Sequence, residues 1–175
     1  MKRTYVLFVA AVASATLLLV GGPLGATQGG TFKADLIGYE EVPAVSTAAT
    51  GEFRAKVGAG PVIDYTLTYS NIQNAFAAHI HLGQKDVNGG VSAFLCGGGD
   101  KPTCPPTGGT VSGTIDAADI IGPTSQGIAP GEIQELLDAM EFGVTYANVH
   151  TTDGDTTPNE GPGDFPGGEI RGQIR

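Results

Sequence analysis

Apolar and polar residues alternate one by one along several short segments of this chain. The alternation runs from 32 to 36, from 52 to 57 and from 63 to 70. A period of two residues is typical of a β-strand with one buried face. Gly58-Ala59-Gly60-Pro61 separates the second and third segments, and the pair is predicted to form a β-hairpin. Strands are predicted at 31–41, 52–57, 63–70, 76–82, 91–96, 110–115, 144–151 and 169–174.

A single helix is predicted from Gly131 to Phe142. Pro130 precedes it, Gly143 suits its end, and its apolar residues fall on one stripe: Ile133, Leu136, Leu137 and Met140. One helical turn is predicted at 116–121, and 152–168 is an acidic loop rich in Gly and Pro. The predicted fold is all-β, an antiparallel β-sandwich or Greek-key barrel with one α-helix covering an edge or end.

The N-terminal segment has the pattern of an export signal. Lys2 and Arg3 precede an uncharged, mostly apolar run from 5 to 20, and Gly21-Gly22-Pro23 then ends any helix. Residues 1–26 are therefore predicted to be a signal peptide, with a retained N-terminal membrane anchor as the alternative. The apolar run is shorter than the ~20 residues that span a bilayer, which favours cleavage. Residues 31–175 form the single predicted domain.

Charge and cysteine content agree with export. The chain has 18 acidic residues against nine Lys and Arg, and removing 1–26 takes away only positive charge. Such an acidic chain is not expected to bind nucleic acid, and no membrane span is predicted after cleavage. The expected partner is extracellular and unidentified. Cys96 and Cys104 are predicted to form a disulfide in an oxidising compartment, with a metal site or a redox pair as alternatives.

The three histidines of the chain occupy two predicted strands. His79 and His81 are two residues apart and project from one face, while Ala78, Ile80 and Leu82 form an apolar row on the other. His150 lies on a later strand. If the strands are neighbours, these histidines and, with less support, Glu169 converge on the face away from the core. Three imidazoles suit Cu or Zn.

Two other interpretations of these polar residues stay open. The histidines could be surface groups bonded to carboxylates, and Glu169 with Arg171 could be a surface ion pair. The acidic loop lacks the Gly and final Glu of an EF-hand, but it offers oxygen ligands for Ca²⁺, the less favoured metal. These ligands are Asp153, Asp155, Asn159, Glu160 and Asp164. No nucleophile motif, phosphate-binding loop or dinucleotide fingerprint is present, so no catalytic residue is predicted.

Several motifs resemble those of CHRD domains, the module named after chordin. They are the segments 32–43, 78–83, 88–91, 146–151 and 167–174, in family order. The resemblance implies a secreted or surface protein of microbial type with a mostly undefined activity. Chordin's cysteine-rich modules are lacking, so growth-factor binding is not implied. The link between His150 and Glu169 is longer than is usual in the family.

The His-x-His strand also resembles the copper site of Cu,Zn superoxide dismutases, but no fourth histidine exists to bridge to zinc. The expected function is therefore a secreted, non-catalytic binding or structural module with a His-based Cu or Zn site. A copper-dependent redox enzyme resembling superoxide dismutase is the first alternative. A calcium-binding adhesion or matrix protein is the second.

Overall fold

The computed structural model describes residues 29–155, 157–159 and 161–175. The predicted signal peptide lies outside the described residues. The strands are β1 (Thr31–Ile37), β2 (Thr50–Val57), β3 (Ile63–Ser70), β4 (Ala75–Leu82), β5 (Gly90–Cys96), β6 (Gly109–Ile115), β7 (Thr145–Thr151) and β8 (Ile170–Gln173). The helix is α1 (Ile133–Glu141), and short 3₁₀ turns are η1 (Gly38–Glu40), η2 (Ala117–Asp119) and η3 (Thr124–Gln126).

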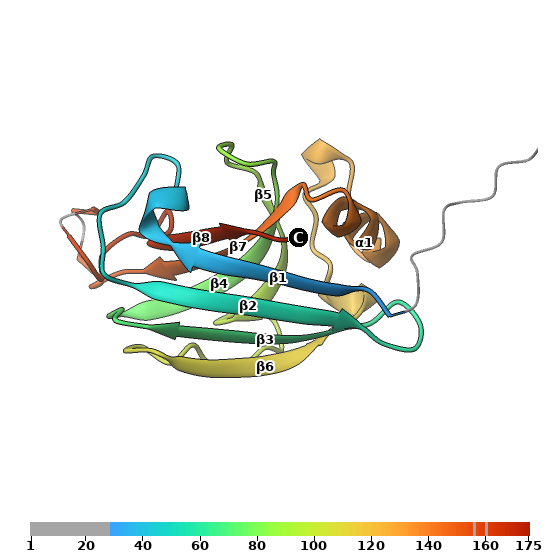
Figure 1. Ribbon diagram of the computed structural model, residues 1–175, viewed down its shortest axis with the longest axis horizontal. Coiled ribbons are helices and arrows are strands. Elements are labelled where there is room, and N and C mark those ends of the chain that lie inside the picture. The colour runs from blue at the N-terminus through green and yellow to red at the C-terminus, as the bar shows by residue number, and fades with distance from the viewer. Residues whose placement is uncertain (1–28, 156, 160) are drawn as a thin grey trace, which may run out of the picture.

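The strands form one antiparallel sheet in the order β5-β4-β7-β8-β1-β2-β3-β6. The sheet curls into a nearly closed barrel, which brings its edge strands β5 and β6 close to each other (Figure 1). Helix α1 lies at one end of this barrel, and the loop between β7 and β8 lies at the other (Figure 1). The predicted fold class is confirmed. None of the helices in the described part of the chain is long and apolar enough to cross a membrane.

The core is built from the inward-facing positions of the alternating segments. Along β1 every second residue is buried, and the same pattern holds on β3, where Ile63 and Leu67 are fully buried. The predicted stripe of α1 joins this core, because Ile133, Leu136, Leu137 and Met140 are all buried there. Burial of these apolar side chains is the main favourable contribution to folding.

The first strand is shorter than predicted. It ends at Ile37, and the next residues form η1, because the chain turns back and the Val45 amide donates to the Gly38 carbonyl oxygen at 2.8 Å. A side chain at Gly38 would bring its Cβ within 2.3 Å of the Val45 oxygen, so this close approach needs glycine. The turn carries Glu41 away from the barrel's outer edge and into a buried position.

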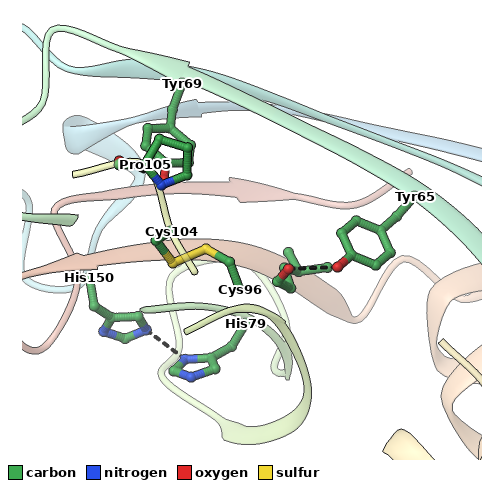
Figure 2. Close-up of a disulfide and its surroundings, with 8 residues drawn as sticks. Tyr65, Tyr69, His79, Cys96, Cys104, Pro105 and His150 are labelled. Carbon is green, nitrogen blue, oxygen red and sulfur yellow. Dashed lines mark hydrogen bonds between the residues drawn. A yellow bond between two sulfur atoms is a disulfide. The ribbon is translucent and has the colours of Figure 1, made fainter. Parts of the chain in front are cut away.

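Strand β5 is irregular where it pairs with β4. The register shifts twice, between Ala78 and His79 and between Ile80 and His81, so Leu95 and Ser92 are extra residues on β5. The Leu95 carbonyl accepts from the Tyr65 hydroxyl at 2.6 Å, a bond that Figure 2 shows, and the Ser92 carbonyl accepts from the Ile121 amide at 3.0 Å.

The cysteines lie where β5 ends. Cys96 is its last residue, and it forms a disulfide with Cys104, as predicted (Figure 2). Both cysteines are buried in the core cluster, and the Tyr69 hydroxyl donates to the carbonyl of neighbouring Pro105 at 3.0 Å. The disulfide therefore fixes the connection between β5 and β6 against the interior of the barrel.

Candidate metal centre

The barrel brings the three histidines together on adjacent strands. His79 and His81 lie on β4 and His150 on β7, which pair antiparallel with His79 opposite Asn148 and Ala77 opposite His150. Ala78 and Ile80 point into the core, so the imidazoles share the other face, as their spacing predicts. One ring nitrogen from each histidine lies within 4.8 Å of the other two. The two strands thus form a three-nitrogen cluster.

Backbone carbonyls fix the protonation of two of these rings. His81 Nδ1 lies 3.0 Å from the Gly89 oxygen, and His150 Nδ1 lies 2.9 Å from the Pro166 oxygen. A carbonyl oxygen only accepts hydrogen bonds, so both Nδ1 atoms carry the proton and both Nε2 atoms keep a lone pair. This arrangement, in which one ring nitrogen is anchored and the other is free, is what metal-binding histidines use.

Two of the histidines contact each other, and the third keeps an unpaired ring nitrogen. His79 Nδ1 lies 2.9 Å from His150 Nε2 (Figure 2), and since the latter holds a lone pair, His79 donates in this bond. His81 Nε2 is buried and has no hydrogen-bond partner among the described residues. An unsatisfied buried acceptor costs about 1–3 kcal/mol, so a group that accepts this lone pair stabilises the site. A cation is such a group.

Burial keeps the imidazoles neutral. Their exposed fractions are only 7–9 %, and burial lowers the pKa of His79 to about 3, with repulsion from His150 and His81 adding to it. Burial likewise lowers the pKa of His81 to about 4, against the opposing bond to Gly89, and it lowers the pKa of His150. The alternative of surface histidines bonded to carboxylates is therefore wrong, because the rings are buried and two of them bond to backbone carbonyls.

Aromatic rings support the histidines. Tyr146 stacks on His81 with ring centroids 4.7 Å apart and planes 5° from parallel, and the Arg171 guanidinium lies 3.4 Å from the Tyr146 ring centre. On the other side Phe94 contacts His79 edge-on at 4.6 Å. The sequence pattern did not indicate that Tyr146 and Arg171 stack beside the histidines.

The comparisons with known proteins agree with the motifs. The sequence model of the CHRD domain matches residues 32–158, which is more than two thirds of the chain. The chain belongs to the CHRD domain family. All three histidines lie inside the matched part of the CHRD domain, whereas β8 and the acidic residues beyond 158 lie outside it. No curated protein and no solved structure matches the chain.

Glu169 of this CHRD domain is placed differently from the histidines. It is fully buried, and its two oxygens accept from the Thr47 hydroxyl at 2.6 Å, the Thr151 hydroxyl at 2.8 Å and the Gly163 amide at 2.8 Å. It is not part of the three-nitrogen cluster. Arg171 is buried too and bonds to the carbonyls of Gln84 and Val87, so the proposed surface ion pair of the two is wrong. Glu169 anchors the CHRD domain's loop 161–168 to β7.

Three carboxylates of the acidic loop also lie close together. Carboxylate oxygens of Asp153, Asp155 and Asp164 lie within 4.8 Å of one another, while Glu160 lies outside the described residues. The first two carboxylates accept from backbone amides two residues onward, at 3.0 and 2.7 Å. These are turn-forming bonds that acidic loops make without a cation.

Proposed function

We propose that this protein is a secreted, non-catalytic extracellular module that holds a Cu or Zn ion on three histidines. The ligands in this proposal are Nδ1 of His79 and Nε2 of His81 and His150. The observation that carries it is the buried Nε2 of His81, which keeps a lone pair and has no partner while two further ring nitrogens lie within 4.8 Å.

The donor chemistry supports a transition metal rather than calcium. Neutral imidazole nitrogens suit Cu and Zn, whereas Ca²⁺ takes oxygen ligands. Because burial holds the rings neutral, an incoming ion need not displace protons from imidazolium groups. Nδ1 of His79 and Nε2 of His150, which now share a hydrogen bond, would both hold the ion, and the His79 proton would then reside on Nε2. The Gly89 and Pro166 carbonyls keep the other two rings oriented.

Export is supported by the N-terminal pattern and by the disulfide. Lys2 and Arg3 before an apolar run fit a signal peptide, and the Cys96–Cys104 bond is of the kind that persists in oxidising compartments. The extracellular partner is left to experiment.

Metal titration of untagged, metal-free protein tests the proposal. We expect one equivalent of Cu or Zn to bind and, at about 100 times its Kd, to raise Tm by about 5–10 °C. His81→Ala should lose most of this increase, whereas the acidic-loop variant Asp155→Asn should keep it. If neither metal binds, or if His81→Ala responds as the parent does, the proposal is wrong. A Ca²⁺ effect lost in Asp155→Asn would favour the calcium-binding alternative.

A copper-dependent redox enzyme resembling superoxide dismutase is the second candidate. It is favoured by the all-imidazole donor set, which is of the kind that suits copper. Superoxide consumption by the copper-loaded protein, lost in His81→Ala, would support it. An inactive copper-loaded protein would leave the non-catalytic module.

A further inference from the structure

A concavity opens on the surface of the barrel, outside the histidine cluster. It has a volume of about 630 Å³ and lies between the segment 41–46, which follows η1, and the loop 161–168. Val42, Pro43 and Val45 supply one apolar wall and Phe165 faces them from the loop. None of the histidines lines it, so it is separate from the proposed metal site.

Glu41 contributes a carboxyl group to the lining of this concavity. Its side chain lines the space although the residue is only 7 % exposed, and one carboxyl oxygen accepts from Asn148 Nδ2 at 2.7 Å. No lysine or arginine lines the concavity, and among the described residues none lies within 4.0 Å of the Glu41 carboxyl. A buried carboxyl without a direct ion-pair partner is costly in its charged form, and Arg171 offsets this cost for Glu41 only in part.

Glycine at position 168 lets the backbone pack closely against this carboxyl. Gly168 lies against it with φ +130°, and a Cβ there would come within 2.6 Å of Glu41 Oε1 and 2.8 Å of Asn148 Oδ1. That Asn148 oxygen is buried and has no partner among the described residues. The site therefore combines a buried carboxyl that has no direct ion-pair partner, an unused amide acceptor beside it and apolar residues in its lining.

From this arrangement we propose that the concavity binds a primary alkyl- or aralkylammonium group, with Glu41 as its counter-ion. The ammonium supplies a direct ion-pair partner for Glu41 and N–H donors, while Val45 and Phe165 cover its carbon chain. The acidic net charge of the chain adds a long-range attraction for cations. The source is either a free amine or a lysine side chain, since both present the same group.

The charges around Glu41 predict a proton signature for this binding. Burial raises the pKa of Glu41 to about 8, with Glu169 raising it further and with Arg171 and Asn148 opposing. The carboxyl is thus mostly protonated at pH 7 in the empty site. An ammonium that pairs with the carboxylate makes Glu41 release its proton to the buffer, while the amine keeps its own. A neutral ligand releases none.

Isothermal titration with benzylamine, and with benzyl alcohol as the neutral isostere, tests the proposal at pH 7. We expect benzylamine to bind at least about tenfold more tightly, with a proton release that approaches one in buffers of different ionisation enthalpy. Glu41→Gln should weaken benzylamine binding by at least about tenfold and abolish the release, leaving benzyl alcohol unchanged. Glu40→Gln, the half-exposed neighbour, is the matched control and should behave like the parent.

A second variant covers the case in which Glu41→Gln does not fold. Ala44 is exposed at the rim, so Ala44→Lys should fold and should weaken amine binding through its own ammonium. Equal affinity for amine and alcohol, no binding of benzylamine up to about 10 mM, or binding without proton release would each overturn the proposal. An acetylated, amidated Gly-Lys-Gly peptide separates the sources: tighter binding than benzylamine identifies a lysine side chain, and weaker binding a free amine.

Discussion

Replacing Glu41 with Gln should make the stability of the protein less dependent on pH. The variant keeps the shape of the side chain and an oxygen for the Asn148 bond, but it cannot ionise. In the parent, burial raises the pKa of Glu41 from 4.5 to about 8, so between these values the folded state holds a proton that the unfolded state has lost. The contribution of Glu41 to stability therefore falls as pH rises through this window.

The size of the effect follows from the two pKa values. At 1.36 kcal/mol for each pH unit, the interval from 4.5 to about 8 corresponds to about 5 kcal/mol. Below pH 4.5 the carboxyl is neutral in both states and the two proteins should differ little in their pH response. Above pH 8 the parent bears the full cost of the buried charge. The free energy of unfolding of Glu41→Gln, compared with that of the parent, should therefore be higher there than at pH 4.

Urea unfolding of both proteins from pH 4 to pH 9 measures this difference. Tyrosine fluorescence and circular dichroism serve as probes, since the chain has no tryptophan. The histidines titrate in both proteins, so their contribution cancels in the difference. Glu40→Gln provides the control for loss of one nearby acidic group. Stability curves of parent and Glu41→Gln that run parallel across the whole range would refute the reasoning.

Three further predictions concern the barrel and its histidines. Replacing Cys96 and Cys104 by Ser should lower the free energy of unfolding by about 2.5 kcal/mol, the loop-closure value for so short a loop, which urea unfolding with and without reductant checks. Leu137→Ala should cost about 3 kcal/mol because the side chain is buried beneath α1, whereas exposed Phe142→Ala should cost little. Metal-free protein should lose stability as pH falls from 6.5, the ordinary histidine pKa, to about 3, the pKa of His79 in the folded protein, because only the unfolded chain takes up a proton in this range. His79→Gln should lose less stability over the same range.

The regular part of the fold could be predicted from the sequence because it depends on periodicity. Alternation identified β1 to β3, and the stripe of Ile133, Leu136 and Leu137 identified α1. The spacing of His79 and His81 placed both rings on the non-core face for the same reason. The sequence order of the strands does not reveal that β4 pairs with β7, and it is this pairing that brings His150 to them.

The surroundings of the site could not be predicted, because loops create them. The carbonyls of Gly89 and Pro166 set the histidine tautomers, and a backbone carbonyl carries no sequence signal. Glu41 is the last residue of the predicted strand 31–41, and nothing in that pattern indicates that the chain turns at η1 and buries this carboxyl. Strand alternation predicts Glu169 as a possible ligand, whereas in the structure its oxygens accept from the hydroxyls of Thr47 and Thr151, which come from distant segments.

The bulged strand β5 has a consequence for the behaviour of the protein at high concentration. An open sheet edge offers carbonyl groups to which a strand of another molecule adds, and this is how amyloid-like stacking begins. On β5 the two bulge residues have already given their carbonyls to Tyr65 and Ile121. A strand added here would therefore meet a bent edge on which two carbonyls are already bonded, and this disfavours polymerisation through β5.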